Sequence, residues 1–211
     1  MAARLRRRRR GPGTPGRPGQ AAGRGLPRLA DLFIATAALV IAAPLLAIAA
    51  IAIKADSRGP VFYRAVRAGR GGEDFELLQL RTMHTGNDPV GVGTPVYADD
   101  PRVTRAGYWL RRFSLDELPN LINVIRGEMS VVGPRPTLTA QVAEYTPRQR
   151  LRLEVKPGIT GWAQVNGRAE IPWDQRIELD VYYVEHRTPG LDLKILARTA
   201  RLLLTGQGLY G

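Results

Sequence analysis

The 211-residue chain has no cysteine and only two histidines. Without cysteine it can have no disulfide, no thiolate nucleophile and no cysteine-based zinc site. His84 and His186 are far apart and lack the spacing of metal ligands, so we do not expect a histidine-built metal site. Any chemistry must therefore come from carboxylates, hydroxyls, amides and arginines.

Acidic residues are absent from the N-terminal part of the chain. The net charge is +12, but residues 1–28 hold nine of the 31 lysines and arginines and no acid, so the rest carries only about +3. Because the basicity belongs mainly to this tail, the body is not predicted to bind a polyanion, and we expect no nucleic-acid partner. Segment 1–27 is rich in arginine, glycine and proline and is predicted to be disordered.

A long apolar run follows the basic tail. Residues 32–53 carry no charge, and as a helix they would extend roughly 33 Å, enough to reach across a bilayer core. A cleavable signal peptide usually has a shorter apolar region. Composition alone favours a spanning anchor. Pro44 supports a third interpretation, a re-entrant helix broken near its middle with both ends on one side of the membrane.

The rest of the chain alternates short strands, loops and helices. Two strands are predicted at 60–67 and 75–81, around a glycine-rich turn whose glycines are too irregular for a phosphate loop. Segments 84–101 and 156–168 are predicted to be loops, and the second has the composition of a ligand-binding loop. Helices are predicted at 103–112, 115–126, 137–152, 173–187 and 191–205.

The densest cluster of charged residues has two interpretations. Ser114 and Glu117 have the spacing of a helix capping box, which would place Asp116 and Glu117 in the first turn of a helix for structural reasons alone. Alternatively, an acid pair just after Arg111 and Arg112 can hold a divalent cation and face a phosphorylated ligand. The residues alone leave both interpretations open.

Gly133-Pro134-Arg135-Pro136 presents an arginine between two conformationally restricted prolines. A guanidinium held in this way suits a phosphate, because its donors form a planar fork. A rigid loop with a solvated arginine explains the same residues comparably well.

Several sequence blocks together resemble a known family. They are RAGRGGEDFELLQLRTM, VTRAGYWLRRFSLDELPNLINVIRGEMSVVGPRP, KPGITGWAQVNGR and LDVYYVEH, in this order after an apolar helix. They are similar to the bacterial sugar transferase family, the monotopic polyprenyl-phosphate phosphoglycosyl transferases. The resemblance covers about residues 28–204. It is closest to the minimal catalytic form, which lacks the extra N-terminal membrane bundle of larger members.

The resemblance implies a two-step transfer. A nucleoside diphosphate sugar, usually a UDP-sugar, would bind with Mg²⁺, and the carboxylate matching Asp116 would attack its β-phosphate. Polyprenyl phosphate in the membrane would then accept the phosphosugar, which starts a lipid-linked glycan such as an exopolysaccharide. Glu117 matches the second acid, implicated in Mg²⁺ coordination, so both acids are metal candidates.

The resemblance also implies phosphate-binding residues. Arg111 and Arg135 match positions expected to grip phosphate, and Arg112, Arg105 and Lys156 are weaker candidates.

Two positions depart from the family pattern. Gln79 stands where members often have lysine, and we expect Arg81 to compensate for the missing cation. Ala43 stands where members often have serine before the proline that matches Pro44.

Substrate supply then favours the re-entrant helix, because nucleotide sugars are cytoplasmic. The expected segments are a tail at 1–27, a re-entrant membrane helix at 28–54 and a catalytic domain at 55–211 on the cytoplasmic face of the bacterial inner membrane. The fold class is a helix-rich α/β domain with a small β-hairpin or sheet and amphipathic helices that contact membrane lipid. The oligomeric state stays open, a homodimer included.

Two non-catalytic functions compete with the enzyme. One is a membrane-anchored binding protein whose basic tail binds RNA or anionic lipid, and the other is a scaffold in a glycan assembly complex. Both predict that Asp116→Asn is harmless. The enzyme predicts that this change abolishes activity.

Overall fold

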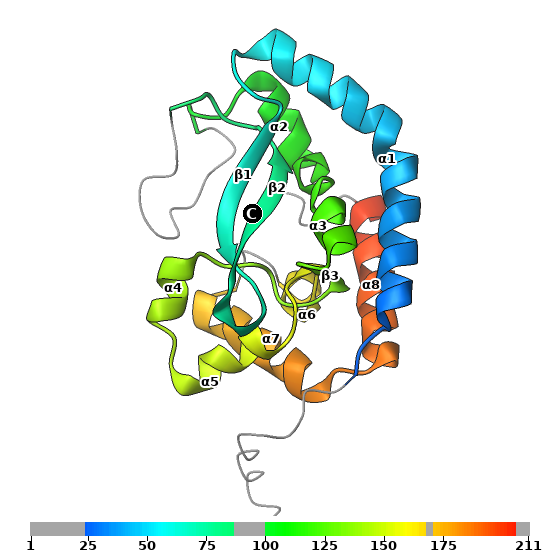
Figure 1. Cartoon of the computed structure of the whole chain (residues 1–211), viewed down its shortest axis with the longest axis vertical. Helices are drawn as coiled ribbons and strands as arrows, with labels where there is room; N and C mark the ends of the chain where they lie inside the picture. Colours follow the sequence, from blue (N-terminus) through cyan, green and yellow to red (C-terminus); the bar gives the residue numbers. More distant parts are fainter. Residues whose placement is uncertain (1–23, 87–99, 168–170, 206–211) are drawn as a thin grey trace, which may run out of the picture.

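The computed structural model describes residues 24–86, 100–167 and 171–205. It confirms a helix-rich α/β fold with small sheets and one long apolar N-terminal helix (Figure 1). Most of the predicted tail at 1–27 and of the predicted loop at 84–101 lies outside the described residues.

The long helix α1 (Arg28–Asp56) is continuous through Pro44. It is the only helix in the described ranges that is long and apolar enough to cross a membrane by length and composition. Its ribbon bends near the middle (Figure 1), as expected where a proline removes a backbone donor. The predicted break is therefore a bend within one helix. The large apolar side chains exposed along it are Leu29, Phe33, Val40, Ile41, Leu45, Ile48 and Ile51.

The N-terminal end of α1 is bonded to the body of the protein. Asp31 is 5% exposed, and its carboxylate accepts hydrogen bonds from Ser130 Oγ at 2.8 Å and from Val131 N at 3.0 Å. Arg28 donates to carbonyl oxygens in the last turn of helix α3 (Asn120–Arg126) at 2.7 and 2.9 Å, where a cation also complements the helix dipole. A buried carboxylate is tolerated here because its oxygens have partners.

The C-terminal end of α1 is bonded to the same body. Asp56 Oδ2 accepts a hydrogen bond from Ala106 N at 2.8 Å. Arg81 donates to the carbonyl oxygens of Ser57 at 2.9 Å and of Arg58 at 2.5 Å. Both ends of the apolar helix thus contact one globular unit, over which α1 arches (Figure 1).

The predicted hairpin is confirmed. β1 (Phe62–Ala68) pairs antiparallel with β2 (Asp74–Leu80) across the 3₁₀ turn η1 (Arg70–Gly72). Two glycines of that turn have positive φ, which glycine adopts without steric cost. The outer edge of β2 is satisfied by Asn123, which accepts from Leu78 N at 3.0 Å and donates to Glu76 O at 2.7 Å.

The helices after the hairpin agree only partly with the sequence pattern. The predictions for 103–112, 173–187 and 191–205 are confirmed, whereas 115–126 and 137–152 are each split. The observed elements are α2 (Arg105–Arg112), η2 (Leu115–Glu117), α3 (Asn120–Arg126), α4 (Thr139–Ala143), α5 (Pro147–Arg150), η3 (Leu151–Glu154), α6 (Trp162–Val165), α7 (Trp173–His186) and α8 (Pro189–Thr205).

The single helix predicted at 137–152 is wrong because Pro147 begins a new helix. Thr146 caps that helix, since it accepts from Gln149 N while Gln149 Oε1 accepts from Thr146 N at 2.9 Å. A proline at the first helical position loses no hydrogen bond, whereas inside a helix it would.

A second sheet was not predicted. β3 (Ser130–Val132) pairs in parallel with β4 (Gly158–Thr160). Three residues a strand are too few for a readable alternation. This sheet joins the segment after α3 to the predicted loop at 156–168, part of which is α6. The main core cluster surrounds it, with Val124, Met129, Val132 and Ile195 almost completely buried.

Candidate functional site

Two neighbouring carboxylates lie on a short turn between two helices. After α2 the chain reverses at Ser114, whose φ of 53° lies in the left-handed region. Asp116 and Glu117 follow on η2, and α3 then begins at Asn120, directly after Pro119. Positive φ is uncommon for residues other than glycine, and such strain is frequent at functional sites. The reversal places both acids outside a regular helix.

The predicted capping box is wrong. Ser114 makes no side-chain cap hydrogen bond, because its left-handed backbone turns the chain before any α-helix starts. Glu117 instead pairs with Arg135. The capping box therefore does not account for this pair of acids, although both lie in the first turn of η2 as expected.

Arg135 reaches Glu117 from the loop that follows β3. Its Nη2 donates to Glu117 Oε1 at 2.5 Å, and 56% of the Arg135 side chain is exposed. The negative charges of Glu117 and Asp116 raise the pKa of Arg135, so its guanidinium stays charged. An exposed ion pair contributes little to folding. It does leave a solvent-accessible cation beside two carboxylates.

The loop that presents Arg135 is held against the PGITG segment. Gly133 N donates to Thr160 O at 2.8 Å, and Gly158 N donates to Pro134 O at 2.9 Å. A Cβ on Gly158 would collide with the backbone of Gly133. Only glycine allows two backbones to approach so closely. The predicted rigidity of the loop is thus matched by bonds along its backbone.

Asp116 is the acid with the most perturbed pKa near this loop. Burial and the nearby charge of Glu117 raise the pKa of Asp116 to about 7, while the charges of Arg111 and Arg135 act in the opposite direction. Two adjacent acids with different surroundings suit two different roles. The carboxylate of Asp116 becomes easier to ionise once a further cation approaches.

Arg111 approaches Asp116 from the last turn of α2. Its Nε donates to Thr82 Oγ1 at 2.9 Å, which orients the guanidinium, and its charge acts on the pKa of Asp116. The structure therefore brings Arg111, Arg135, Asp116 and Glu117 together, as the sequence predicts. Such a set can bind a phosphorylated ligand and present a carboxylate to it.

The other two arginines of α2 are not drawn into this cluster. Arg112 lies over the ring of Trp109, 5.6 Å from its centroid, and Nη1 donates to Tyr108 OH at 3.2 Å. Arg105 is exposed at the start of α2, and the described residues supply no hydrogen bond or ion pair to its guanidinium.

The remaining two candidates also lie elsewhere. Lys156 is near Arg28 and Gly127 at the C-terminal end of α3, away from the acids that precede that helix. Burial and the charge of Arg28 lower the pKa of Lys156. Arg81 is 5% exposed and bonds the last carbonyl oxygens of α1 and those just after it. Its donors thus hold the end of α1, so Arg81 does not replace the cation missing at Gln79.

Arg67 is a candidate that the sequence reasoning missed. Burial lowers the pKa of Arg67, and the nearby charge of Arg135 lowers it further. Side chains two residues apart on a strand lie on the same face, so Arg67 shares a face of the hairpin with the buried Ala65. This alternation is the sequence signal from which Arg67 could have been predicted. Thr82, the partner of Arg111, had no comparable signal.

The donor set is compatible with Mg²⁺ that arrives with a substrate. The described residues contain no group of three or more histidines, cysteines or acids that could hold a metal ion on their own. Mg²⁺ is commonly bound through one or two carboxylates together with substrate phosphates, and Asp116 and Glu117 supply such a pair. The like-charge interaction that raises the pKa of Asp116 would be relieved by a cation.

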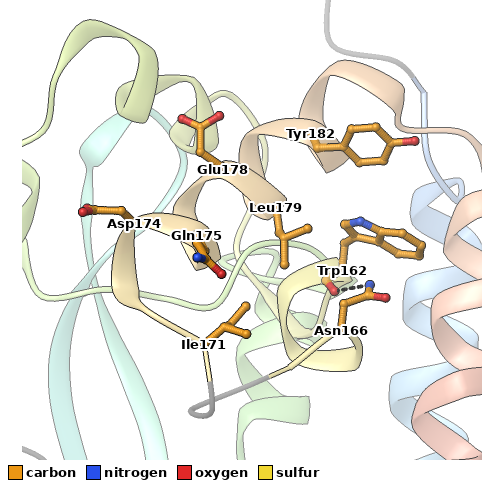
Figure 2. A pocket seen from close by; sticks show the side chains of 8 residues that line it. All are labelled: Trp162, Asn166, Ile171, Asp174, Gln175, Glu178, Leu179 and Tyr182. Atoms are coloured by element: carbon orange, nitrogen blue, oxygen red, sulfur yellow. Dashed lines mark hydrogen bonds between the residues drawn. The ribbon is translucent and has the colours of Figure 1, made fainter.

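A cavity of about 590 Å³ lies between α6 and α7 (Figure 2). Trp162 and Tyr182 stack at one end of it, with ring centroids 6.1 Å apart. Its lining consists of Trp162, Asn166, Ile171, Asp174, Gln175, Glu178, Leu179 and Tyr182. It contains neither predicted acid. Part of the predicted ligand loop, including Trp162, therefore borders a separate cavity.

Comparison with known proteins identifies the class. A profile of the family described as bacterial sugar transferase matches residues 23–206. The chain belongs to this family, and the predicted enzyme class, a sugar-phosphate transferase acting on polyprenyl phosphate, is confirmed.

Named relatives narrow the comparison. The uncharacterized sugar transferase EpsL of Bacillus subtilis (strain 168) is 43% identical over 87% of this chain and 90% of its own length. The UDP-glucose:undecaprenyl-phosphate glucose-1-phosphate transferase of Caulobacter vibrioides is 44% identical over 87% of this chain and 71% of its own length. The UDP-N-acetylgalactosamine-undecaprenyl-phosphate N-acetylgalactosaminephosphotransferase of Aeromonas hydrophila is 38% identical over 84% of this chain and 43% of its own length.

Proposed function

We propose that this chain transfers a sugar-1-phosphate from a UDP-sugar to polyprenyl phosphate through a covalent intermediate on Asp116. The observation that carries the proposal is the carboxylate of Asp116 between the charges of Arg111 and Arg135, beside the second acid Glu117. The relatives named for UDP-sugars and undecaprenyl phosphate support the two substrate classes.

In the first displacement an oxygen of the Asp116 carboxylate attacks the β-phosphorus of the UDP-sugar. The bond from that phosphorus to the bridging oxygen breaks, and UMP leaves with the electron pair. The sugar phosphate is then joined to the aspartate as an acyl phosphate. Arg111 and Arg135 offset the negative charge of the diphosphate, which would otherwise repel the carboxylate.

In the second displacement a phosphate oxygen of polyprenyl phosphate attacks the same phosphorus. The acyl phosphate bond breaks, Asp116 is released as a carboxylate, and the product is a polyprenyl diphosphate sugar. No proton needs to be transferred in either step, because attacking and leaving groups are all oxyanions. Aspartate is an established covalent acceptor of phosphoryl groups.

Glu117 and Asp116 would hold Mg²⁺ together with the diphosphate. When bound, the ion supplies positive charge to the diphosphate oxygens. Glu117 also holds Arg135 in place through the ion pair at 2.5 Å, so its loss would affect both charges around the substrate.

The arrangement of α1 supports a monotopic topology, and we assign the body to the cytoplasmic face of the inner membrane because nucleotide sugars are cytoplasmic. Both ends of the apolar helix are bonded to one body, and a single body cannot lie on both sides of a bilayer. The exposed apolar side chains of α1 would then face lipid, with the bend at Pro44 inside it. The aspartate would in this way meet a soluble donor and a lipid acceptor at one interface.

The order of product release tests this function. Purified protein is mixed with Mg²⁺ and each of several UDP-sugars in the absence of polyprenyl phosphate. A two-step mechanism predicts that UMP appears in an amount equal to the enzyme and that further UMP requires the lipid. If UMP release with the cognate donor always required the lipid, the covalent mechanism would be contradicted.

A further inference from the structure

The backbone carbonyl of Arg135 is bonded to a buried arginine. Pro134 and Pro136 flank Arg135 and lack backbone N–H groups, so few backbone donors are available to fix this point of the loop. Arg152 Nη2 donates to Arg135 O at 2.9 Å, from η3. This contact lies behind the loop, whereas the Arg135 side chain is exposed toward Glu117.

Arg152 is itself fixed on several sides. It is 4% exposed, and its Nη2 also donates to Asp180 Oδ2 of α7 at 2.6 Å. Its Nη1 donates to Tyr145 OH at 2.5 Å, and that hydroxyl donates to Thr137 Oγ1 at 3.3 Å. One guanidinium therefore bonds the loop directly at Arg135 and, through Tyr145, two residues further along the chain.

Stability alone is a weak explanation for this network. Burying an ion pair costs about as much in lost solvation as the pair returns, and apolar replacements of such pairs are often neutral or stabilising. The network is also incompletely bonded, because Arg152 Nε and Asp180 Oδ1 have no hydrogen-bond partner among the described residues. An incompletely bonded buried network is costly. What it does provide is a fixed location for Arg135 O.

We propose that Arg152, held by Asp180, is a positioning residue that fixes the Arg135 loop so that the Arg135 guanidinium meets the substrate diphosphate beside Asp116. The expected effect on the rate of UMP release rests on the proposed function. The expected effect on the position of the loop does not. Misplacement of a phosphate-binding group by about 1 Å can lower a rate on the order of 100-fold.

Two variants separate positioning from folding. Arg152→Lys keeps a cation for Asp180 but cannot bond Tyr145 OH and Arg135 O with the same fork. The double variant Arg152→Met with Asp180→Leu removes both charges at once and fills the space with apolar atoms. Arg198→Lys is the matched control, because it makes the same substitution at another arginine, whose hydrogen bond to Asn166 Oδ1 at 2.7 Å lies outside the loop.

Hydrogen exchange and kinetics give the two readouts. Both Arg152 variants are expected to exchange amide hydrogens of segment 133–138 faster than the parent protein, and to release UMP about 10- to 100-fold more slowly with an intact fold. Arg198→Lys should change neither the exchange of this segment nor the rate of UMP release. In an Arg135→Ala background the Arg152 variants should cause no further loss of rate, because they act through Arg135.

Unchanged exchange in segment 133–138 in folded Arg152 variants would overturn the proposal. The proposal would also be overturned if the Arg152 variants slowed UMP release in the Arg135→Ala background by as much as they do in the parent protein. If the parent protein released no UMP with any donor, the proposed function would fail, and the exchange measurement would still decide whether Arg152 fixes the loop.

Discussion

At the scale of single residues, the site depends on charges that oppose one another. Asp116 has two arginines and one acid around it, and burial together with that acid outweighs the arginines in raising the pKa of Asp116. The protein thus holds a carboxylate in a place that disfavours its charge. Catalytic groups are commonly held at such a cost, which is recovered when the substrate binds.

The raised pKa of Asp116 predicts how stability depends on pH. The folded value of about 7 lies above the ordinary value of 3.8, so the folded state binds more protons than the unfolded state between these limits. The contribution of Asp116 to stability is therefore full below about pH 4 and is lost as pH rises through about 7. Asp116→Asn should raise the melting temperature relative to the parent more at pH 8 than at pH 4.

Thermal melts of the two proteins across this range provide the measurement. Asp174→Asn, which removes an exposed carboxylate of the cavity in Figure 2, is the control for the loss of one negative charge. A difference in melting temperature that is the same at every pH would contradict the raised pKa.

The sequence was informative for residues whose neighbours in the chain define the pattern. Asp116, Glu117, Arg111 and Arg135 could be predicted because they stand in motifs. The positions of Arg81 and Lys156 could not, since they depend on contacts with distant segments such as the two ends of α1.

At the scale of elements, α1 is an integral part of the fold. Its first turn bonds the segment of β3, and its last turn is bonded by α2 and by Arg81. Strongly periodic helices such as α7 and α8 were predictable, whereas α4, α5 and η3 were not, because short capped turns outweigh periodicity there. β3 and β4 depend on pairing across 25 or more residues of chain, which a local pattern does not record.

Removal of Arg81, which bonds the end of α1, should lower the stability of the fold more than the rate of UMP release. Arg81→Ala leaves partly buried carbonyl oxygens without their donor, and each lost bond to a charged donor costs about 1.5–3 kcal/mol. The unfolding free energy should fall by about 2 kcal/mol or more. UMP release per folded molecule should stay within a few fold, because Arg81 does not contact the acids.

Chemical denaturation and active-site titration measure these two effects. Arg64→Ala is the control, since that side chain is 68% exposed in an ion pair at 3.4 Å and contributes little to stability. If Arg81→Ala slowed UMP release but left the free energy of unfolding unchanged, this prediction would be contradicted and Arg81 would act on the substrate.

At the scale of the whole molecule, one body contacts both ends of an apolar helix. The basic tail adds nine positive charges in residues 1–28, which would favour the anionic cytoplasmic leaflet. The sugar is set by neither fold nor family, because the relatives are named for glucose and for N-acetylgalactosamine donors.

The topology can be tested with single cysteines, because the chain has none of its own. Arg24→Cys and Ala55→Cys place exposed thiols near the two ends of α1, and Arg64→Cys marks the body. A re-entrant helix predicts that a membrane-impermeant maleimide labels all three in inverted vesicles and none in intact spheroplasts. Labelling of positions 24 and 55 from opposite sides would establish a spanning helix instead.

The most direct measurement is the mass of the protein after incubation with Mg²⁺ and its cognate UDP-sugar, followed by peptide mapping. The mechanism predicts an increase equal to one sugar phosphate, located on the peptide that contains Asp116, absent in Asp116→Asn and lost when polyprenyl phosphate is added. An Asp116→Asn protein that still transfers the sugar phosphate to the lipid at the parent rate would contradict it.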